Sequence, residues 1–375
     1  MIDYLEVSSE KNRDNRFTKD DVLSVSGEYG IVNQIEFQGR SFAGASVSNY
    51  GVVENGDVVY TKSPLKSNPY GIIKTNKGIP GIVSTLYAVY KPKEITDSKF
   101  VQIYFELDSR MNSYMHPLVN KGAKNDMKVS AENALKGMVS FPKKDEQEMI
   151  SLYFSNLDHL ITLHQRKCEQ TKNLKKYMLQ KMFPQNGAKV PEIRFNGFTH
   201  DWEQRKFGSL LEETRNKTIF EDEDTLLSCA IDGMYLNSEL FSHFRGSSNI
   251  GYLKVKKNDL ILSAQNLHLG NCNVNLRFEH GIISPAYKVY ELVGCNPLFM
   301  QAWVKKDSTK DFFLKSSTEG ASVCRKNIVW EELYKQELPV PSIEEQTKVG
   351  EYFYSLDHLI TLHQRQHKLH LNALL

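Results

Sequence analysis

The amino-acid sequence predicts an α+β protein with an internal repeat, in which two mixed domains are each followed by a long helix. Three observations predict this fold class. The ten residues "LDHLITLHQR" occur at 157–166 and again, letter for letter, at 356–365. Similar strand-like stretches precede both copies in the same order. Both copies also lie in segments that have the apolar spacing of a long helix.

The repeat is much longer than ten residues. Upstream, "GIVSTLYAVY" (81–90) resembles "GIISPAYKVY" (281–290), and "NGDVVYTKS" (55–63) resembles "KNDLILSAQ" (257–265). Nearer the helices, matched residues keep one offset of 199 positions: Pro142 and Pro341, Glu146-Gln147 and Glu345-Gln346, and Tyr153-Phe154 and Tyr352-Phe353. Chance does not produce such an ordered series. The sequence therefore predicts, in chain order, a domain, a helix, a linker with a second domain, and a second helix: 1–142, 143–183, 184–341 and 342–375.

Each domain is predicted to mix strands and helices. Asn55-Gly56-Asp57 and Asn258-Asp259 are typical of turns that lead into strands. The stretches 81–90 and 281–290 are rich in β-branched and aromatic residues, which favour strands. The stretches 97–115 and 296–315 have a more helical pattern. Each domain is therefore expected to be of the α+β class.

The two long helices have different start signals. Ser342 and Glu345 have the spacing of a capping box after Pro341, whereas the first helix has only Pro142 followed by Lys143. The first helix is expected to end at Met182, before Phe183-Pro184. A helix of about 40 residues is roughly 60 Å long at 1.5 Å per residue.

The apolar residues of both helices recur in steps of three and four, which is typical of a coiled-coil seam. Since the helices follow equivalent domains, the simplest partner of each is the other, antiparallel about a pseudo-twofold axis. The pair would separate the two domains by a fixed length. The predicted seam residues are Ile150, Phe154, Leu157, Ile161 and His164 in the first helix, and Val349, Phe353, Leu356, Ile360 and His363 in the second.

Histidines interrupt this seam at matched positions. His363, His367 and His370 have a spacing that can bind zinc on one helix face. No acidic residue or cysteine lies at a spacing in the sequence that would indicate a further zinc ligand. We therefore interpret His164 and His363 as buried polar residues that fix the helix register, and predict no metal site.

The composition excludes several classes of protein. A hydrophobic content of 40% and a charged content of 25% are ordinary for a globular protein, and the formal net charge of +2 requires any basic surface to be local. Five scattered cysteines without a C-x-x-C indicate neither a disulfide framework nor a zinc knuckle. The sequence has no apolar signal segment and no apolar run near 18 residues. A cytoplasmic protein without a membrane partner is expected.

Two helical stretches resemble a known family. "EQEMISLYFSNLDHLITLHQRKCEQTKNLKKYMLQKMFPQ" (146–185) followed by "VPEIRFNGFTHDWEQRKFGSLL" (190–211) resembles the central region of type I restriction-modification specificity subunits. "PVPSIEEQTKVGEYFYSLDHLITLHQRQHKL" (339–369) resembles their C-terminal region. The order of parts is similar over essentially the whole chain.

The resemblance implies a function without catalysis in this chain. Two target-recognition domains, separated by an antiparallel pair of helices, would each bind one half of a bipartite site in double-stranded DNA. Two methyltransferase subunits would dock on the chain, and motor-nuclease subunits would complete the complex. S-adenosylmethionine, ATP and Mg would be bound by those partner subunits and no cofactor by this chain.

Two features depart from the family pattern. A segment like 190–211 usually precedes the first recognition domain as well, but here Tyr4-Leu5-Glu6 already matches Leu210-Leu211-Glu212. The second helix also stops at Leu375, about nine residues short of the first by its match. Both ends are therefore expected to be shorter than in the family, which would affect the ability of the chain to assemble into the complex.

The best candidates for DNA contact lie where the repeats differ. "TKSPLKSNPYGIIKTNKG" (61–78) and "SAQNLHLGNCNVNLRFEH" (263–280) occupy the same place between matched strands. Lysine suits phosphate, Asn and Gln suit adenine, and Arg suits guanine. The candidates in these two inserts are Lys62, Lys66, Asn68, Tyr70, Lys74 and Lys77, and Gln265, Asn266, His268, Asn271, Asn273 and Arg277. The alternative is that both inserts are solvated polar loops.

A second candidate surface lies at 120–130 and 318–330, which share a Gly-Ala pair followed by basic residues. Such residues would neutralise phosphates and make binding depend on salt. The candidates are Lys121, Lys124, Lys128, Arg325 and Lys326. A charged loop over a strand is the equally simple interpretation. Lys172, Lys175, Lys176 and Lys181 form either a solvated helix face or a surface close to DNA.

The sequence lacks the motifs that would indicate an enzyme. "SNPYG" (67–71) has one proline fewer than the Asn-Pro-Pro-Tyr signature of amino-methyltransferases, and no glycine-rich cofactor loop precedes it. No Walker A sequence and no convincing nuclease motif occur. The competing class is an interaction protein whose coiled coil is the functional surface and whose domains do not read a DNA sequence.

Overall fold

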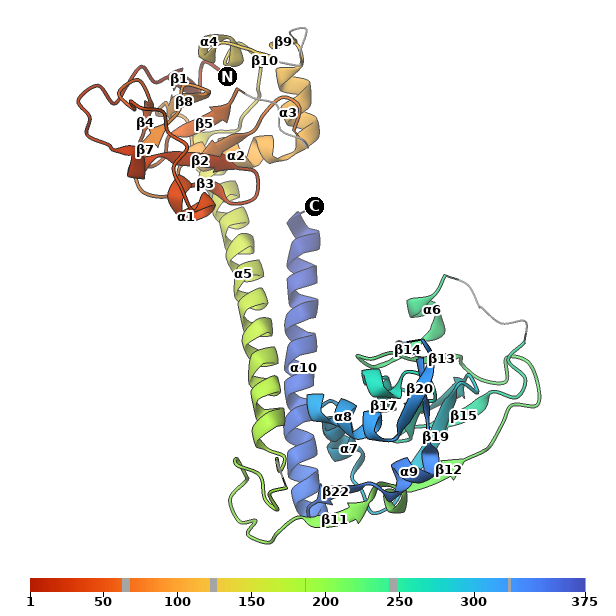
Figure 1. The fold of residues 1–375 in the computed structure, drawn as a ribbon. Coiled ribbons are helices and arrows are strands. Elements are labelled where there is room, and N and C mark those ends of the chain that lie inside the picture. The colour runs from red at the N-terminus through yellow and green to blue at the C-terminus, as the bar shows by residue number, and fades with distance from the viewer. Residues whose placement is uncertain (63–67, 122–126, 186, 243–247, 323–324, 375) are drawn as a thin grey trace. The chain divides into compact units, whose positions relative to one another are not determined.

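The computed structural model describes residues 1–62, 68–121, 127–185, 187–242, 248–322 and 325–374 (Figure 1). It divides into two compact units, one of Met1–Leu160 with the C-terminal tip of the chain, and one of Ile161–Ala373. The mixed helix and strand content and the two long helices predicted from the sequence are confirmed. The boundary between the units falls within the first long helix, so it differs from the predicted domain limits.

Unit 1 is built on a four-stranded antiparallel sheet in the order β1-β8-β5-β6. Three smaller strand pairs, β2-β3, β4-β7 and β9-β10, complete the first repeat. Its strands are β1 Leu5–Val7, β2 Leu23–Ser26, β3 Gly30–Asn33, β4 Gly51–Val53, β5 Val58–Thr61, β6 Ile73–Thr75, β7 Gly81–Val83, β8 Tyr87–Pro92, β9 Asn120–Lys121 and β10 Met127–Lys128. Its helices are η1 Lys19–Asp21, α1 Gln34–Gln38, α2 Ser98–Glu106, α3 Asp108–Met115, α4 Ala131–Ala134 and the start of α5 Lys144–Lys181.

Unit 2 repeats this topology. Its four-stranded sheet has the order β12-β19-β16-β17, and the smaller pairs are β13-β14, β15-β18, β20-β21 and β11-β22. Its strands are β11 Glu203–Lys206, β12 Leu211–Thr214, β13 Leu227–Cys229, β14 Met234–Leu236, β15 Leu253–Lys256, β16 Leu260–Ser263, β17 Cys272–Val274, β18 His280–Ile283, β19 Tyr287–Leu292, β20 Ser317–Ser322, β21 Arg325–Ile328 and β22 Glu337–Val340. Its helices are η2 Phe207–Leu210, α6 Asn237–Leu240, η3 Leu267–Leu269, α7 Pro297–Val304, α8 Asp307–Lys315, α9 Trp330–Lys335 and α10 Ile343–Leu374.

The agreement between the repeats extends to single bridges. Val22 forms an isolated parallel bridge with Ile82, and Leu226 forms the equivalent bridge with Ile282. Both bridges join the start of the β2 or β13 strand to the β7 or β18 strand. The internal repeat inferred from the sequence is therefore a repeat of topology and register.

Two predicted strands are each divided in two. The stretch 81–90 forms β7 and β8, and 281–290 forms β18 and β19. The amide of Tyr87 donates to the carbonyl of Ser84 at 3.0 Å, and Tyr287 donates to Ser284 at 3.1 Å. These turns move the chain from a two-stranded pair into the four-stranded sheet. Residue composition predicts strand but carries no signal for where the strand changes partner.

Other local predictions are confirmed. The helical stretches 97–115 and 296–315 form α2 with α3 and α7 with α8. The predicted turns precede β5 and β16, and the residues that make them have positive φ, Gly56 at 89° and Asn258 at 73°. The predicted capping box of α10 is only half correct. The amide of Glu345 lies 3.4 Å from Ser342 Oγ, but the Glu345 carboxylate binds Arg194 with both oxygens, at 2.7 and 2.8 Å.

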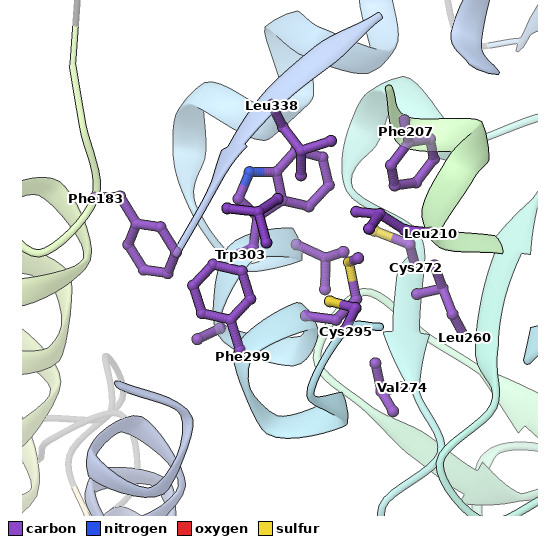
Figure 2. Close-up of a cluster of buried hydrophobic side chains, with 14 of the residues drawn as sticks. Phe183, Phe207, Leu210, Leu260, Cys272, Val274, Cys295, Phe299, Trp303 and Leu338 are labelled. Carbon is purple, nitrogen blue, oxygen red and sulfur yellow. The ribbon is translucent and has the colours of Figure 1, made fainter. Parts of the chain in front are cut away.

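The core of unit 2 joins the end of α5, the sheet and the start of α10. Figure 2 shows Phe183 beside Phe299, with Trp303, Leu338 and Phe207 continuing the same cluster. Val349, Phe353 and Leu356 belong to this core, although the sequence assigned them to the helix seam. A Cβ on Gly350 would lie 2.6 Å from the amide nitrogen of Phe299, so the absence of a side chain lets α10 approach α7 closely.

The two long helices meet within unit 2. His164 of α5 contacts His363 of α10, and Lys175 lies 2.5 Å from Asp357. Contacts therefore move backward along α10 as they move forward along α5, which makes the helices antiparallel over this stretch. Of the remaining predicted seam residues, Leu157 is buried, and Ile150, Phe154, Ile161 and Ile360 are half-buried.

Candidate nucleic-acid interface

The insert of the first repeat contributes less free surface than the sequence indicates. Lys74 lies on β6 and is only 4% exposed, with its Nζ 2.6 Å from Glu106 of α2. Tyr70 is buried and packs its ring edge against His116. The side chains of Lys74 and Tyr70 belong to the domain interior, so this conformation does not favour them as DNA contacts, and their predicted role stays untested.

Other residues of this insert remain accessible. Lys77 is exposed, and Lys62 is half-buried with a pKa lowered by burial and by Lys11. Asn68 is half-buried and donates to Asp108 Oδ1 at 2.6 Å. Lys66 lies outside the described residues. Lys62 and Lys77 are therefore the lysines of this insert that the structure leaves as candidates for phosphate contact.

The insert of the second repeat also contains both buried and accessible residues. Asn273 is 0% exposed, donates to the carbonyl of Ala230 at 2.6 Å and accepts from Gln301 at 3.3 Å. These bonds hold Asn273 inside the domain, so this conformation does not favour its predicted contact with DNA, which stays untested. Gln265 is exposed and Asn266 is half-buried. These two precede η3 and keep accessible amide groups.

Arg277 and His268 have more specific environments. Arg277 is exposed, and its guanidinium binds both carboxylate oxygens of Glu239, at 2.9 and 2.7 Å. His268 is 9% exposed, and neither of its ring nitrogens has a hydrogen-bond partner among the described residues. Burial and the nearby Lys326 lower the pKa of His268. Its low exposure does not favour His268 as a DNA contact in this conformation, and the prediction for it stays untested. Asn271 is half-buried.

In unit 2, one residue of the second predicted surface lies near the insert. Lys326, on the β20-β21 pair, contributes to the lowering of the pKa of His268 in the insert, and it is half-buried. The side chains of Lys121, Lys128 and Arg325, and all of Lys124, lie outside the described residues, so the second predicted surface of unit 1 stays a prediction.

Sequence analysis missed the residues that fix the inserts in place. Asn76 is buried and donates to the carbonyls of Glu54 and Ile79, both at 3.1 Å. Asn275 makes the equivalent bonds to Lys256 and Phe278, at 3.0 and 2.8 Å. Each side-chain oxygen also accepts a backbone N–H two or three residues later. The available signal was that Asn76 and Asn275 match at the 199 offset within inserts that otherwise differ.

The matched glutamines at the start of the long helices have a similar role. Gln147 accepts from the amide of Asp97 at 3.0 Å and donates to the carbonyls of Ile95 and Pro142, at 3.1 and 2.8 Å. Gln346 accepts from the amide of Asn296 at 2.7 Å and donates to the carbonyl of Pro341 at 3.0 Å. Both side chains are buried. Each long helix is thereby joined to the helical part of the domain that precedes it.

A groove of about 1250 Å³ lies in unit 2 between α5, the α7–α8 corner and α10. Its floor includes Leu179, Leu298 and Phe353, and lysines and aspartates alternate around it. Lys306 is almost buried in it, with its ammonium 4.7 Å from the centroid of the Phe183 ring, and burial lowers its pKa to about 8. An apolar floor with charges of both signs resembles a protein-binding surface more than a phosphate-binding surface.

The described residues contain no group of three metal-ligating side chains that could hold a metal ion, and no helix long and apolar enough to cross a membrane. The structure therefore provides no metal centre for this surface within the part of the chain that it describes.

No model of a known protein family and no curated protein matches the chain. Among solved structures, the chain is similar to the type I restriction-modification system S subunit from M. genitalium, with 13% identity, a TM-score of 0.54, and coverage of 99% of this chain and 92% of that chain. It is also similar to the HsdS subunit from Thermoanaerobacter tengcongensis, with 14% identity, a TM-score of 0.44, and coverage of 98% and 92%. A chain from a structure on complex assembly and conformational transition of the type I R-M system has 12% identity, a TM-score of 0.41, and coverage of 98% and 91%. The chain thus has the fold of the M. genitalium S subunit.

Proposed function

We propose that the chain is the DNA-reading specificity subunit of a type I restriction-modification complex, with one half-site read by each repeat. The observation that carries this proposal is that two copies of one topology hold different inserts at the same place. Two readers of different sequences need a common scaffold and separate contact residues. The fold shared with the M. genitalium S subunit supports the same function.

The accessible residues of the two surfaces differ in chemistry. The first repeat presents Lys62 and Lys77, which suit phosphate oxygens, whereas the second presents Gln265 and Asn266, whose amides suit adenine in the major groove. Arg277 is exposed and is held by Glu239 through both terminal nitrogens, and a guanidinium suits guanine once it exchanges this carboxylate for the base. The two surfaces would therefore select different half-sites.

The long helices would act as a spacer and as a docking site. Antiparallel helices joined to their domains through buried glutamines set a fixed separation between half-sites, with a few unread base pairs between them. The groove lined by Leu179, Leu298 and Phe353 offers a surface for a partner protein. Two methyltransferase subunits would bind the chain and methylate an adenine in each half-site, using S-adenosylmethionine. Motor-nuclease subunits would supply ATP and Mg chemistry, and this chain itself would perform no catalysis.

Methylation mapping tests the proposal directly. The chain is expressed with its methyltransferase subunit in cells that lack other adenine methylation, and methylated adenines are mapped across the genome. We expect a split motif of two short half-sites separated by a constant gap. The double substitution Gln265→Ala/Asn266→Ala should relax one half-site and leave the other unchanged. Lys189→Ala, an exposed lysine outside the candidate surfaces, is the control. Methylation at one contiguous motif would exclude the two-reader function.

An interaction protein built around the helices is the competing function. It predicts that the chain still binds its partner but gives no sequence-selective DNA retention, and that the substitutions in the second insert change nothing. Copurification of the wild-type chain with the methyltransferase subunit, combined with random methylation, would favour this competing function over ours.

A further inference from the structure

The strongest cluster of titratable groups outside the candidate interface lies between α5 and α10 in unit 2. His164 Nδ1 and His363 Nδ1 are 3.2 Å apart. The ring of His370 stacks on His164, with centroids 5.5 Å apart and planes 25° from parallel. His367 is half-buried, and its Nε2 is buried without a hydrogen-bond partner among the described residues. Four imidazoles are thus gathered in one stretch of the helix contact.

The short contact between His164 and His363 limits how many protons the pair can hold. One Nδ1 must carry a hydrogen and donate it, while the other must accept with its lone pair. A second proton would place two N–H groups and two positive charges face to face at 3.2 Å. The contact therefore needs at least one neutral imidazole with a free Nδ1 lone pair.

The charged neighbours of His164 in the described part of the chain are positive. The groups that act on His164 are His363, His370 and His367 from α10 and Lys167 from its own helix, and all of them oppose its protonation. Together with burial, which is the largest cause, they lower the pKa of His164. Asp357 of α10 binds Lys175 of α5.

We propose that this histidine cluster is a proton-sensitive latch that holds α5 and α10 together at neutral pH and releases them under mildly acidic conditions. A group whose pKa in the folded state lies below its unfolded value binds fewer protons when folded. Helix pairing is therefore fully favoured above the unfolded pKa near 6.5 and weakens as the pH falls through that value. The latch goes beyond the proposed function. If the helices act as a spacer, the latch would keep them paired only near neutral pH.

The repeated decapeptide supplies a matched control. His358 and His363 both lie in the second copy, five residues apart on α10, but His358 is exposed and His363 is half-buried against α5. His358→Gln changes the same residue type on the same helix without touching the latch. His164→Gln/His363→Gln removes both latch imidazoles and keeps side chains that can still donate and accept a hydrogen bond.

Amide hydrogen exchange of the full chain at pH 7.0 and pH 5.5 tests the proposal, with rates corrected for the intrinsic effect of pH on exchange. In the wild-type chain and in His358→Gln, opening of the amides in 164–175 and 357–370 should be about tenfold more frequent at pH 5.5. In the double variant the ratio should fall below about twofold. The single variant His363→Gln should give an intermediate ratio, which keeps the test decisive if the double variant does not fold.

Two results would overturn the latch. One is an equal opening rate at both pH values in the wild-type chain. The other is a tenfold ratio that persists in the variants without His363. Neither result bears on the methylation motif, so failure of the latch is distinguishable from failure of the proposed function.

Discussion

In unit 1, strand β6 places Lys74 inside the domain, paired with Glu106, while in unit 2 the segment between β16 and β17 contains η3 and leaves Gln265 exposed and Asn266 half-buried. Around these different segments the sheet order, the bridges and the buried asparagines are the same. The comparison shows that buried polar groups that bind main-chain atoms belong to the scaffold. The side chains that differ and reach solvent form the candidate interface.

The shared scaffold is tested most strongly at its matched asparagines. Asn76→Ala and Asn275→Ala each remove two hydrogen bonds to main-chain carbonyls and one from a main-chain N–H, so we expect each to lower the free energy of unfolding by about 2–4 kcal/mol. Trp202, Trp303 and Trp330 all lie in unit 2, so tryptophan fluorescence in urea follows Asn275→Ala, and hydrogen exchange of β5 follows Asn76→Ala. The exposed Asn216→Ala is the control. A loss below about 1 kcal/mol in either variant would contradict a common scaffold role.

The two repeats differ in the charge next to an equivalent buried aspartate. Burial and, to a smaller extent, Glu291 raise the pKa of Asp259 to about 6 against the opposing effect of Lys256. Asp57 lies 3.9 Å from Lys91, which opposes the increase that burial, Glu54 and Glu10 cause in its pKa. Because the folded pKa of Asp259 exceeds its ordinary value of 3.8, its ionised form costs stability above about pH 6, and this cost vanishes as the pH falls toward 3.8.

Asp259→Asn keeps an oxygen that can accept from the Lys256 amide and removes the buried charge. We expect it to raise the free energy of unfolding by about 1–2 kcal/mol at pH 8, with the gain disappearing near pH 4. Asp57→Asn should give a smaller gain at pH 8, because Lys91 already stabilises that carboxylate. Urea unfolding at the two pH values measures both variants. An equal gain in the two repeats would show that the neighbouring charge has no effect.

The smallest expected effect concerns Lys77, on the candidate interface of the first repeat. Lys77→Ala should lower the slope of log affinity against log salt concentration by about 0.9, the value for one phosphate contact, without changing the methylation motif. Fluorescence anisotropy of labelled DNA, with the methyltransferase subunit present, measures this slope at several salt concentrations. An unchanged slope would remove Lys77 from the DNA surface of the first repeat.

The sequence predicted the repeat, the two long helices and the place of the inserts, because these depend on patterns that extend over many residues. It did not predict that β7 and β8 are separate strands, since the change of partner depends on a turn between residues with ordinary strand composition. It also treated Lys74 and Asn273 as surface residues, because polar side chains are usually exposed. Burial of such groups depends on partners such as Glu106 and Gln301, which lie 28 to 32 residues away in the chain.

The prediction of the helix seam from the sequence was limited in the same way. The spacing of Val349, Phe353 and Leu356 correctly indicated a buried face of α10, but spacing alone does not identify what covers that face. The structure places these residues in the core formed with Phe183 and Phe299. Leu179 of α5 belongs to the same core, and farther along α10 His363 contacts His164 of α5.

The two buried glutamines have a consequence for how such chains diversify. Among the described residues, the side-chain partners of Gln147 and Gln346 are main-chain amides and carbonyls of the domains that precede them. A main-chain partner is the same whatever side chains surround it, so the joint between helix and domain places no demand on the side chains of that domain. A domain with a wholly different set of surface residues would therefore fit the same helix, provided that its backbone keeps the turn before α2 or α7.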